Sequence, residues 1–274
     1  MKNRIANLVE RQALKIFSYF EKSQYLKGKK KVRKDQLPDF LCIGAQKAGS
    51  TWLYENLRCH PEIFMPDERE LHYFDHQFYR PLSFYVNYFK GNETKIKGES
   101  MPGYGLLDQK RIEFIHQIIP DLKIIYLLRN PIDRAWSHAK MSFTKFHNRP
   151  LASVAEEEFI SHFQGSLSVE KGNYLKIINR WESVYPKEAF SFFFLEEIKQ
   201  YPEKSLNTIF EYLSVSKVSD FNGYKTGQII NPGEPSPIPP NCLKFLEKMY
   251  KRDIHQLAER FGGPARLWLK KHYE

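Results

Sequence analysis

The sequence of 274 residues has little cysteine and no long apolar run. The three cysteines, Cys42, Cys59 and Cys242, are too few and too scattered for a disulfide framework, which favours a reducing compartment. No run approaches the roughly 20 apolar residues that a membrane span needs. Charges throughout the first 25 residues exclude an ordinary secretory signal. We therefore expect a cytoplasmic protein, with the inner membrane surface as a second place where it acts.

Positive charge is in excess, with 42 Lys and Arg against 32 Asp and Glu. A surplus of this size indicates an anionic partner but does not choose among a nucleotide, a nucleic acid, an acidic glycan and a membrane surface. The surplus is concentrated in residues 27–34, which indicates a tail rather than a surface that reads nucleic acid, so no nucleic-acid partner is expected.

Residues 1–35 are interpreted as a basic amphipathic N-terminal arm, and residues 36–274 as one folded domain. The arm is either a solvated helix and linker or a segment that docks on a partner or an anionic membrane through residues 1–34. Its apolar residues recur at helical spacing within residues 1–24: Ile5, Leu8, Val9, Ile16, Tyr19 and Phe20.

The domain alternates short apolar runs, typical of buried strands, with longer helical patterns. This alternation predicts a three-layer α/β fold with a central parallel sheet flanked by helices. The expected strands are 39–44, 96–99, 122–128 and 190–195. The expected helices are 50–58, 108–118, 131–146, 151–164, 173–185, 202–213 and 241–261, the last preceded by a proline-rich loop at 231–240.

The loop after the first expected strand has the composition of a phosphate-binding loop, Gly44-Ala45-Gln46-Lys47-Ala48-Gly49-Ser50-Thr51-Trp52. Small residues let the backbone approach a phosphate, and the amides at a helix start favour its charge. An ordinary turn capped by Ser or Thr remains the alternative. Lys47 precedes Gly49 by two positions instead of following it, so the loop is not a Walker A motif and Mg²⁺-triphosphate chemistry is not indicated.

A second motif follows the third expected strand. It consists of Arg129-Asn130-Pro131 and of Ser137, which comes eight residues after Arg129. Together the two motifs resemble those of sulfotransferases that use 3′-phosphoadenosine 5′-phosphosulfate (PAPS), a family with a P-loop-like fold. The resemblance implies that Arg129 and Ser137 hold the 3′-phosphate. It implies a 5′-phosphosulfate site at Gln46, Lys47, Ala48, Gly49, Ser50, Thr51 and Trp52, with Trp52 either stacked on the adenine or packed in the core.

Further segments resemble the heparan-sulfate-type branch of that family, the N- and 3-O-sulfotransferases, and its bacterial relatives. They are Glu70-Leu71-His72-Tyr73-Phe74 and Gly98-Glu99-Ser100-Met101-Pro102-Gly103-Tyr104. The resemblance implies Glu70 as the catalytic base, with His72 as the second candidate or as an orienting group. Glu99 and Tyr104 are assigned to substrate binding, although Tyr104 also suits simple packing. Lys225 loosely matches a late loop that closes over the 3′-phosphate.

The expected reaction is in-line displacement at sulfur, in which Lys47 stabilises the leaving phosphate and Glu70 accepts a proton. The expected acceptor is a hydroxyl, or an amine, of a carbohydrate or glycolipid. Ser100 stands where many glycosaminoglycan enzymes have lysine, which weakens a heparan-like acceptor. A small alcohol or phenol is the alternative acceptor. A P-loop phosphotransferase and a non-enzymatic polyanion binder are the rival functions. No metal site is predicted, because His60, His138 and His147 lack a recognisable ligand spacing.

Overall fold

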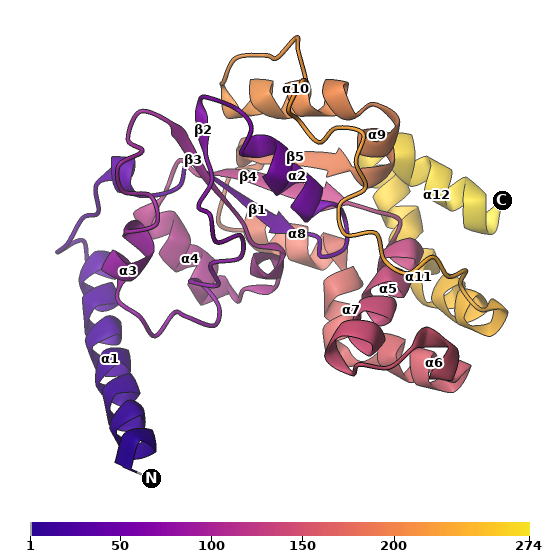
Figure 1. The fold of residues 1–274 in the computed structure, drawn as a ribbon, viewed down its shortest axis with the longest axis horizontal. Helices are drawn as coiled ribbons and strands as arrows, with labels where there is room; N and C mark the ends of the chain where they lie inside the picture. The colour runs from indigo at the N-terminus through magenta and orange to yellow at the C-terminus, as the bar shows by residue number, and fades with distance from the viewer. Residues whose placement is uncertain (1) are drawn as a thin grey trace.

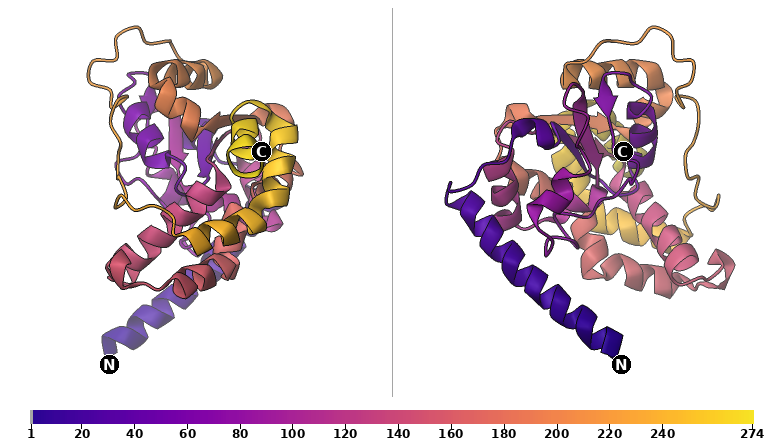
Figure 2. Two further views of the ribbon diagram at one scale, coloured as in Figure 1. Left: turned by 90° about the vertical axis from the view of Figure 1, so that its right-hand side faces the viewer. Right: turned by 60° about the vertical axis from the view of Figure 1, so that its left-hand side comes forward.

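The computed structural model describes the backbone of residues 2–274 and the side chains of residue 12 and residues 14–274. One parallel sheet, in the order β2-β3-β1-β4-β5, forms the centre of the molecule, with helices on both of its faces (Figures 1 and 2). The predicted fold class is confirmed. The strands are β1 Phe40–Gly44, β2 Ile63–Phe64, β3 Ile96–Ser100, β4 Lys123–Leu128 and β5 Phe190–Phe194. Only β2 was not predicted, because a strand of two residues leaves no pattern in the sequence.

Each predicted helix is present, with ends that differ by a few residues, and the structure has four further helices, α3, α7, α9 and α12. Helices α3, α7 and α9 are too short for a clear periodic pattern. Helix α12 begins at the second glycine of the pair Gly262-Gly263, which in the sequence favours the end of a helix, although Pro264 in its first turn suits a new start. The helices after α1 are α2 Ser50–Leu57, α3 Leu82–Val86, α4 Gln109–Ile118, α5 Pro131–Met141, α6 Glu156–Gln164, α7 Ser166–Gly172, α8 Tyr174–Glu182, α9 Leu195–Gln200, α10 Pro202–Leu213, α11 Pro240–Phe261 and α12 Gly263–Tyr273.

The middle of the sheet brings two loops together. Strands β1 and β4 are parallel neighbours, with Phe40 opposite Lys123 and Cys42 opposite Ile125. From β1 the chain proceeds to one side of the sheet, towards β2, and from β4 to the other side, towards β5. Ligand crevices in open α/β sheets lie at such a switch point, outside the carboxyl ends of the strands. The loops after β1 and β4 therefore meet at one edge.

Helix α1, Lys2–Leu26, extends away from the body, and its second half is attached to it (Figure 1). Ser18 Oγ donates a hydrogen bond to the Arg80 carbonyl at 2.8 Å, and Lys22 Nζ donates to the same carbonyl at 2.7 Å. The Glu21 carboxylate accepts a hydrogen bond from the Leu82 amide at 2.8 Å. Residues 18–22 of the predicted arm are thus part of the folded body.

For residues 2–11, in the first half of α1, the structure describes the backbone alone. The side chains of the predicted apolar residues Ile5, Leu8 and Val9 lie outside the described residues. Among the residues that are described, no helix has both the length and the hydrophobicity that crossing a membrane requires.

We predict that Gly98→Ala destabilises the sheet. A Cβ atom at position 98 would lie 2.0 Å from the ring of Phe40, which is fully buried in the neighbouring strand β1. Overpacking of this kind costs about 1–3 kcal/mol in the free energy of unfolding, measured by urea titration. Gly227→Ala is the control, because a Cβ atom there meets nothing within 4 Å. Equal midpoints for the two variants would contradict the close packing of Phe40 on Gly98.

Candidate functional site

The loop after β1 is shaped by two residues in the left-handed region, Lys47 with φ 72° and Gly49 with φ 102°. A Cβ atom at position 49 would lie 3.0 Å from Leu195 Cδ1, so glycine also allows close packing there. Gly49 precedes α2 and has no side chain that could cap it. The first amides of α2 are therefore left for another acceptor, and the helix dipole favours an anion.

The loop after β4 is joined directly to this first loop. The Arg129 guanidinium donates a hydrogen bond from Nη1 to the Lys47 carbonyl at 2.9 Å. Tyr174 donates from its hydroxyl to the Arg129 carbonyl, also at 2.9 Å. Asn130 caps α5 by accepting a hydrogen bond from the Ile132 amide at 2.9 Å. The start of α5 and the loop before α2 are thus held in one arrangement.

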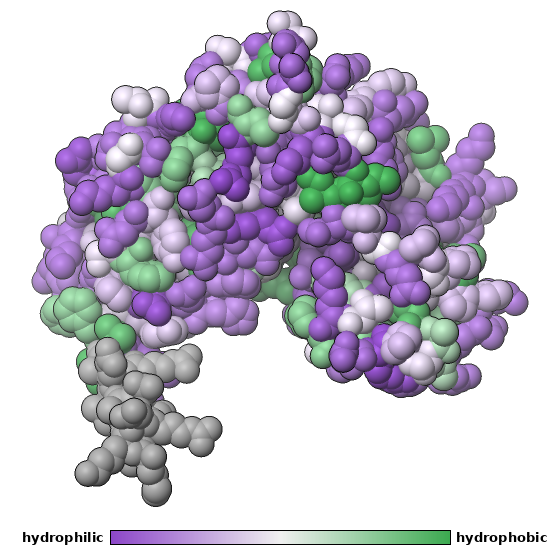
Figure 3. Space-filling view, in the orientation of Figure 1, coloured by the Kyte–Doolittle hydropathy of each residue, from purple (hydrophilic) through white to green (hydrophobic). Residues whose placement is uncertain are grey.

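A cleft of about 560 Å³ opens between these loops, α5 and the segment 226–233. Figure 3 shows this face as largely hydrophilic, with a hollow between the part formed by α3 and α4 and the part formed by α5, α6 and α7. Ala48 is buried below the loop, and its side chain does not line the cleft. Nine residues predicted from the sequence line the cleft: Gln46, Lys47, Gly49, Ser50, Thr51, Trp52, Glu70, Arg129 and Ser137.

The cleft is rich in positive charge. Arg69, Lys140, Lys145 and Lys199 line it in addition to Lys47 and Arg129, and Glu70 is the one acid among the described lining residues. Burial lowers the pKa of Lys47, and the nearby cations lower it further. A cluster of this kind is stabilised by an anion. The sequence analysis did not assign Lys140 and Lys145, although both lie close after Ser137 in the chain.

Glu70 lies within a chain of polar contacts. Arg69 donates from Nη1 to Thr51 Oγ1 at 2.7 Å and places Nη2 3.3 Å from Glu70 Oε1. His72 Nε2 lies 3.9 Å from Glu70 Oε2, and its Nδ1 lies 3.0 Å from Asp75 Oδ2. The segment is not a strand, and His72 has φ 53°, yet the side chains of Glu70 and His72 approach each other. Asp75 was not identified from the sequence.

His76 adds a third potential metal ligand beside His72 and Asp75. One ligand atom from each of the three lies within 4.8 Å of the other two. The prediction of no metal site considered other histidines and did not include this group, whose spacing of three and four residues was visible in the sequence.

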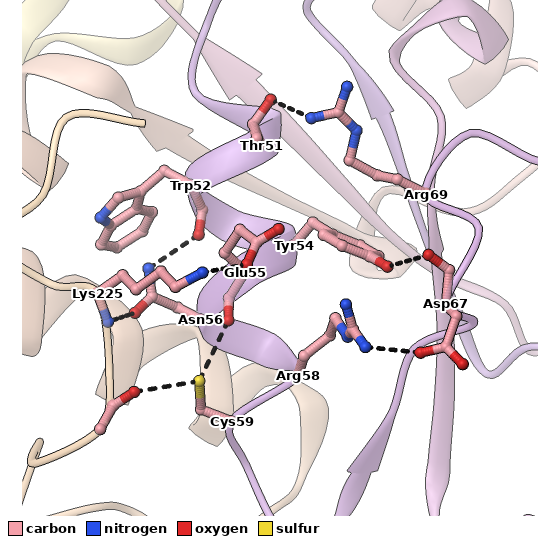
Figure 4. Close-up of polar contacts among 11 residues, drawn as sticks. Thr51, Trp52, Tyr54, Glu55, Asn56, Arg58, Cys59, Asp67, Arg69 and Lys225 are labelled. Carbon is pink, nitrogen blue, oxygen red and sulfur yellow. Dashed lines mark hydrogen bonds and ion pairs between the residues drawn. The ribbon is translucent and has the colours of Figure 1, made fainter. Parts of the chain in front are cut away.

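Lys225 does not line the cleft, contrary to its assignment as a phosphate ligand. Its Nζ lies 2.5 Å from Glu55 Oε2 on α2, and its backbone amide donates to Asn56 Oδ1 at 2.8 Å (Figure 4). Trp52 donates from Nε1 to the Thr226 carbonyl at 3.3 Å. Through these contacts Lys225 and Thr226 attach their loop to α2, and the Lys225 ammonium group points to Glu55.

Glu99 and Tyr104 were assigned to substrate binding, but both side chains are buried in the core. Glu99 accepts hydrogen bonds from the hydroxyls of Tyr85 at 2.6 Å and Tyr104 at 2.8 Å. Burial raises the pKa of Glu99 to about 8. The Tyr104 hydroxyl accepts a hydrogen bond from the Phe74 amide at 3.2 Å. Glu99 and Tyr104 therefore hold the backbone at Phe74, in the segment that carries Glu70 and His72, through the bond to the Phe74 amide.

Comparison with known proteins agrees with this geometry. The chain is 27% identical over 248 residues to heparan sulfate glucosamine 3-O-sulfotransferase 6 of Mus musculus. The alignment covers 87% of this chain and 72% of that enzyme. The match to the human enzyme of the same name spans 54% of its length.

Two solved structures share the fold. The sulfotransferase of Alicyclobacillus acidocaldarius superposes with a TM-score of 0.65 at 23% identity, covering 85% of this chain and 98% of that one. Mouse sulfotransferase SULT7A1, complexed with PAP, gives a TM-score of 0.53 at 17% identity over 89% and 90%. The model of the sulfotransferase domain matches residues 37–225, and the chain therefore belongs to the sulfotransferase family.

Proposed function

We propose that the chain transfers a sulfuryl group from PAPS to a hydroxyl of a carbohydrate or glycolipid. The observation that carries this proposal is the joining of two anion-binding elements in one cleft, through the bond from Arg129 to the Lys47 carbonyl. The uncapped start of α2 and Lys47 suit the 5′-phosphosulfate, and Arg129 and Ser137 suit the 3′-phosphate. A cleft of about 560 Å³ has the usual size for a ligand of this class.

Lys47 and Glu70 divide the chemistry between them. When bound, PAPS supplies the sulfuryl group and a phosphate leaving group. The Lys47 ammonium stabilises the negative charge that develops on the leaving oxygen as its bond to sulfur breaks. Glu70 accepts the proton of the acceptor hydroxyl as that oxygen forms its bond to sulfur. Sulfated acceptor and PAP are the products, and positioning supplies most of the catalysis, as in phosphoryl transfer.

His72 and Asp75 act as positioning residues in this scheme. When the His72 Nδ1–H donates to Asp75, Nε2 is left as an acceptor on the side of Glu70. In this tautomer His72 orients the acceptor hydroxyl, and it orients Glu70 only when Nε2 also carries a proton. Arg69, 3.3 Å from Glu70 and bonded to Thr51 at the start of α2, fixes the carboxylate relative to the phosphosulfate loop.

The acceptor class is supported by the chain's similarity to a heparan sulfate enzyme and by its sequence motifs. The test is incubation with ³⁵S-labelled PAPS and fractions of polysaccharide, glycolipid and small metabolites from the host. Label in the polysaccharide or glycolipid fraction supports the proposal, whereas label only in small alcohols or phenols moves the acceptor to that class. Retention on immobilised PAP with elution by free PAP, rather than by salt alone, separates a sulfotransferase from a nonspecific polyanion binder.

We predict that Arg129→Ala lowers the affinity for PAP about 10- to 100-fold, because hydrogen bonds to a charged group are lost. Affinity for AMP, which lacks the 3′-phosphate, changes much less, as measured by calorimetric titration. The carbonyl of Lys47 also loses its partner in this variant. Equal losses for PAP and AMP would mean that Arg129 acts only by holding the loop.

We predict that Lys47→Ala lowers kcat about 10²–10³-fold and leaves the fold intact, because one electrostatic contact to the leaving oxygen is lost. Lys199→Ala is the matched control, since it removes a cation from the same cleft. Steady-state rates and circular dichroism measure the two effects. A Lys47→Ala variant that keeps more than about a tenth of the activity would remove Lys47 from this role.

We predict that Glu70→Gln lowers kcat about 10²-fold or more while the affinity for PAP changes less than a few-fold. Glutamine keeps the shape and hydrogen bonding of the side chain but does not accept the proton. Glu68→Gln, which changes a nearby exposed carboxylate bonded to Tyr88, is the control.

His72→Ala costs less than Glu70→Gln in this scheme, because His72 orients and Glu70 takes the proton. The reverse ranking of kcat would assign the base to His72. Small losses at both positions would mean that the proton leaves by another route, or that the acceptor is already ionised.

A further inference from the structure

The described second half of α1, residues 14–26, presents large apolar side chains to solvent and polar side chains to the protein, the reverse of an ordinary surface helix. The exposed fractions are 72% for Ile16, 57% for Phe17, 80% for Tyr19 and 65% for Phe20. Ser18, Glu21 and Lys22, which lie between and after them in the sequence, are buried against the body. At the described end of α1, Figure 3 shows hydrophobic atoms on the surface.

The helical repeat explains how one segment exposes apolar side chains and buries polar ones. Successive residues are about 100° apart around a helix, so Ile16 and Ser18 point in nearly opposite directions. Ile16 and Phe20, four residues apart, share the outer face, and Ser18 and Lys22 share the inner one. Phe17 and Tyr19 lie on either side of the outer face. Together they form an apolar surface, which we call the outer face of α1: Ile16, Phe17, Tyr19 and Phe20.

The inner face fixes this orientation. Lys22 Nζ donates to two backbone carbonyls, of Phe78 at 2.8 Å and Arg80 at 2.7 Å, and lies 4.3 Å from the centre of the Phe78 ring. Glu21 accepts from the Leu82 amide at the start of α3. Turning the helix to bury the outer face would break these bonds and leave the Phe78 and Arg80 carbonyls and the Leu82 amide without these partners. The outer face is therefore held towards solvent.

Positive charge lies beside the outer face and follows it in the chain. Lys15 lies beside it, and the chain continues from α1 into an exposed run formed by Lys27, Lys29, Lys30 and Lys31. Over residues 12–34 the sequence has eight Lys and Arg and one acid, Glu21. Lys22 is buried, and Arg33 and Lys34 pair with Asp35 and Asp121, which leaves Lys15 and the four lysines at 27–31 for a partner outside the chain. Apolar side chains flanked by unbalanced positive charge match the two layers of an anionic bilayer surface, acyl chains below and phosphate groups above.

We infer that the outer face of α1, with the lysines at 27–31, docks the enzyme on an anionic phospholipid bilayer. The helix lies in the interface without crossing it. A second copy of the chain carries the same excess of lysine, so charge complementarity favours an anionic bilayer over a second copy. This inference does not depend on the acceptor or on the cofactor of the reaction.

The test is co-sedimentation of the full chain with vesicles of phosphatidylcholine alone and with 30% phosphatidylglycerol. The variant Ile16→Ser/Phe17→Ser/Phe20→Ser changes only side chains that point away from the body. We expect the full chain to bind the anionic vesicles and this variant to bind at least about tenfold more weakly. Leu267→Ser, at an exposed apolar residue of α12, is the matched control and keeps full binding.

A second variant removes charge instead of apolar surface, Lys27, Lys29, Lys30 and Lys31 all to Gln. Each basic residue near an anionic surface contributes about fivefold, so binding falls by more than tenfold and the remaining binding is less sensitive to salt. The charge-matched control removes four exposed cations of α11: Lys244, Lys248, Lys251 and Arg252, all to Gln.

Three results would overturn the inference. The first is no binding of the full chain to anionic vesicles, and the second is equal binding by the apolar variant. The third is a dimer in sedimentation velocity that the apolar variant converts to a monomer, which would assign the outer face to a second copy. Unfolding midpoints equal to that of the unchanged chain establish that the variants are folded. Deleting residues 1–34 is a poorer experiment, because it also removes the bonds made by Glu21 and Lys22.

Discussion

The hydrogen bond from Arg129 to the Lys47 carbonyl is the contact on which the cleft depends. It joins the loop after β1 to the loop after β4. These two strands are neighbours in the sheet, whose order is β2-β3-β1-β4-β5, although they are far apart in the chain. The buried strands thus determine where two segments about 80 residues apart in the chain meet. Arg129 holds the shape of the first loop and offers its remaining donors to the cleft, so binding and architecture share one side chain.

The cleft concentrates positive charge in a partly buried place, and this has a cost. Lys47 loses hydration and faces other cations, which is why its pKa is lowered. The protein does not neutralise the described cleft with carboxylates, apart from Glu70. Lys225 is different, because its partner Glu55 satisfies it within the protein. The cations left without acidic partners are those that an anionic ligand would satisfy.

The sequence predicted the parts of this arrangement that depend on local pattern. Four of the strands, the sheet class and the two loops follow from apolar runs and from residue types that a phosphate needs. Lys225, Glu99 and Tyr104 could not be placed in this way, because their surroundings depend on contacts made with residues far away in the chain. The direction of α1 was also hidden, since periodicity finds an apolar face and does not say whether the protein covers it.

The buried carboxyl of Glu99 releases a proton when the protein unfolds near neutral pH. In the native state its pKa is about 8, because burial disfavours the charged form, against an ordinary value of 4.5. Between these values the native chain holds a proton that the unfolded chain gives up. This group therefore makes the folded state less stable as the pH rises from about 4.5 to about 8. The hydroxyl network beneath the segment 70–74 thus couples unfolding to proton release at Glu99, and heats of unfolding near neutral pH will include the ionisation heat of the buffer.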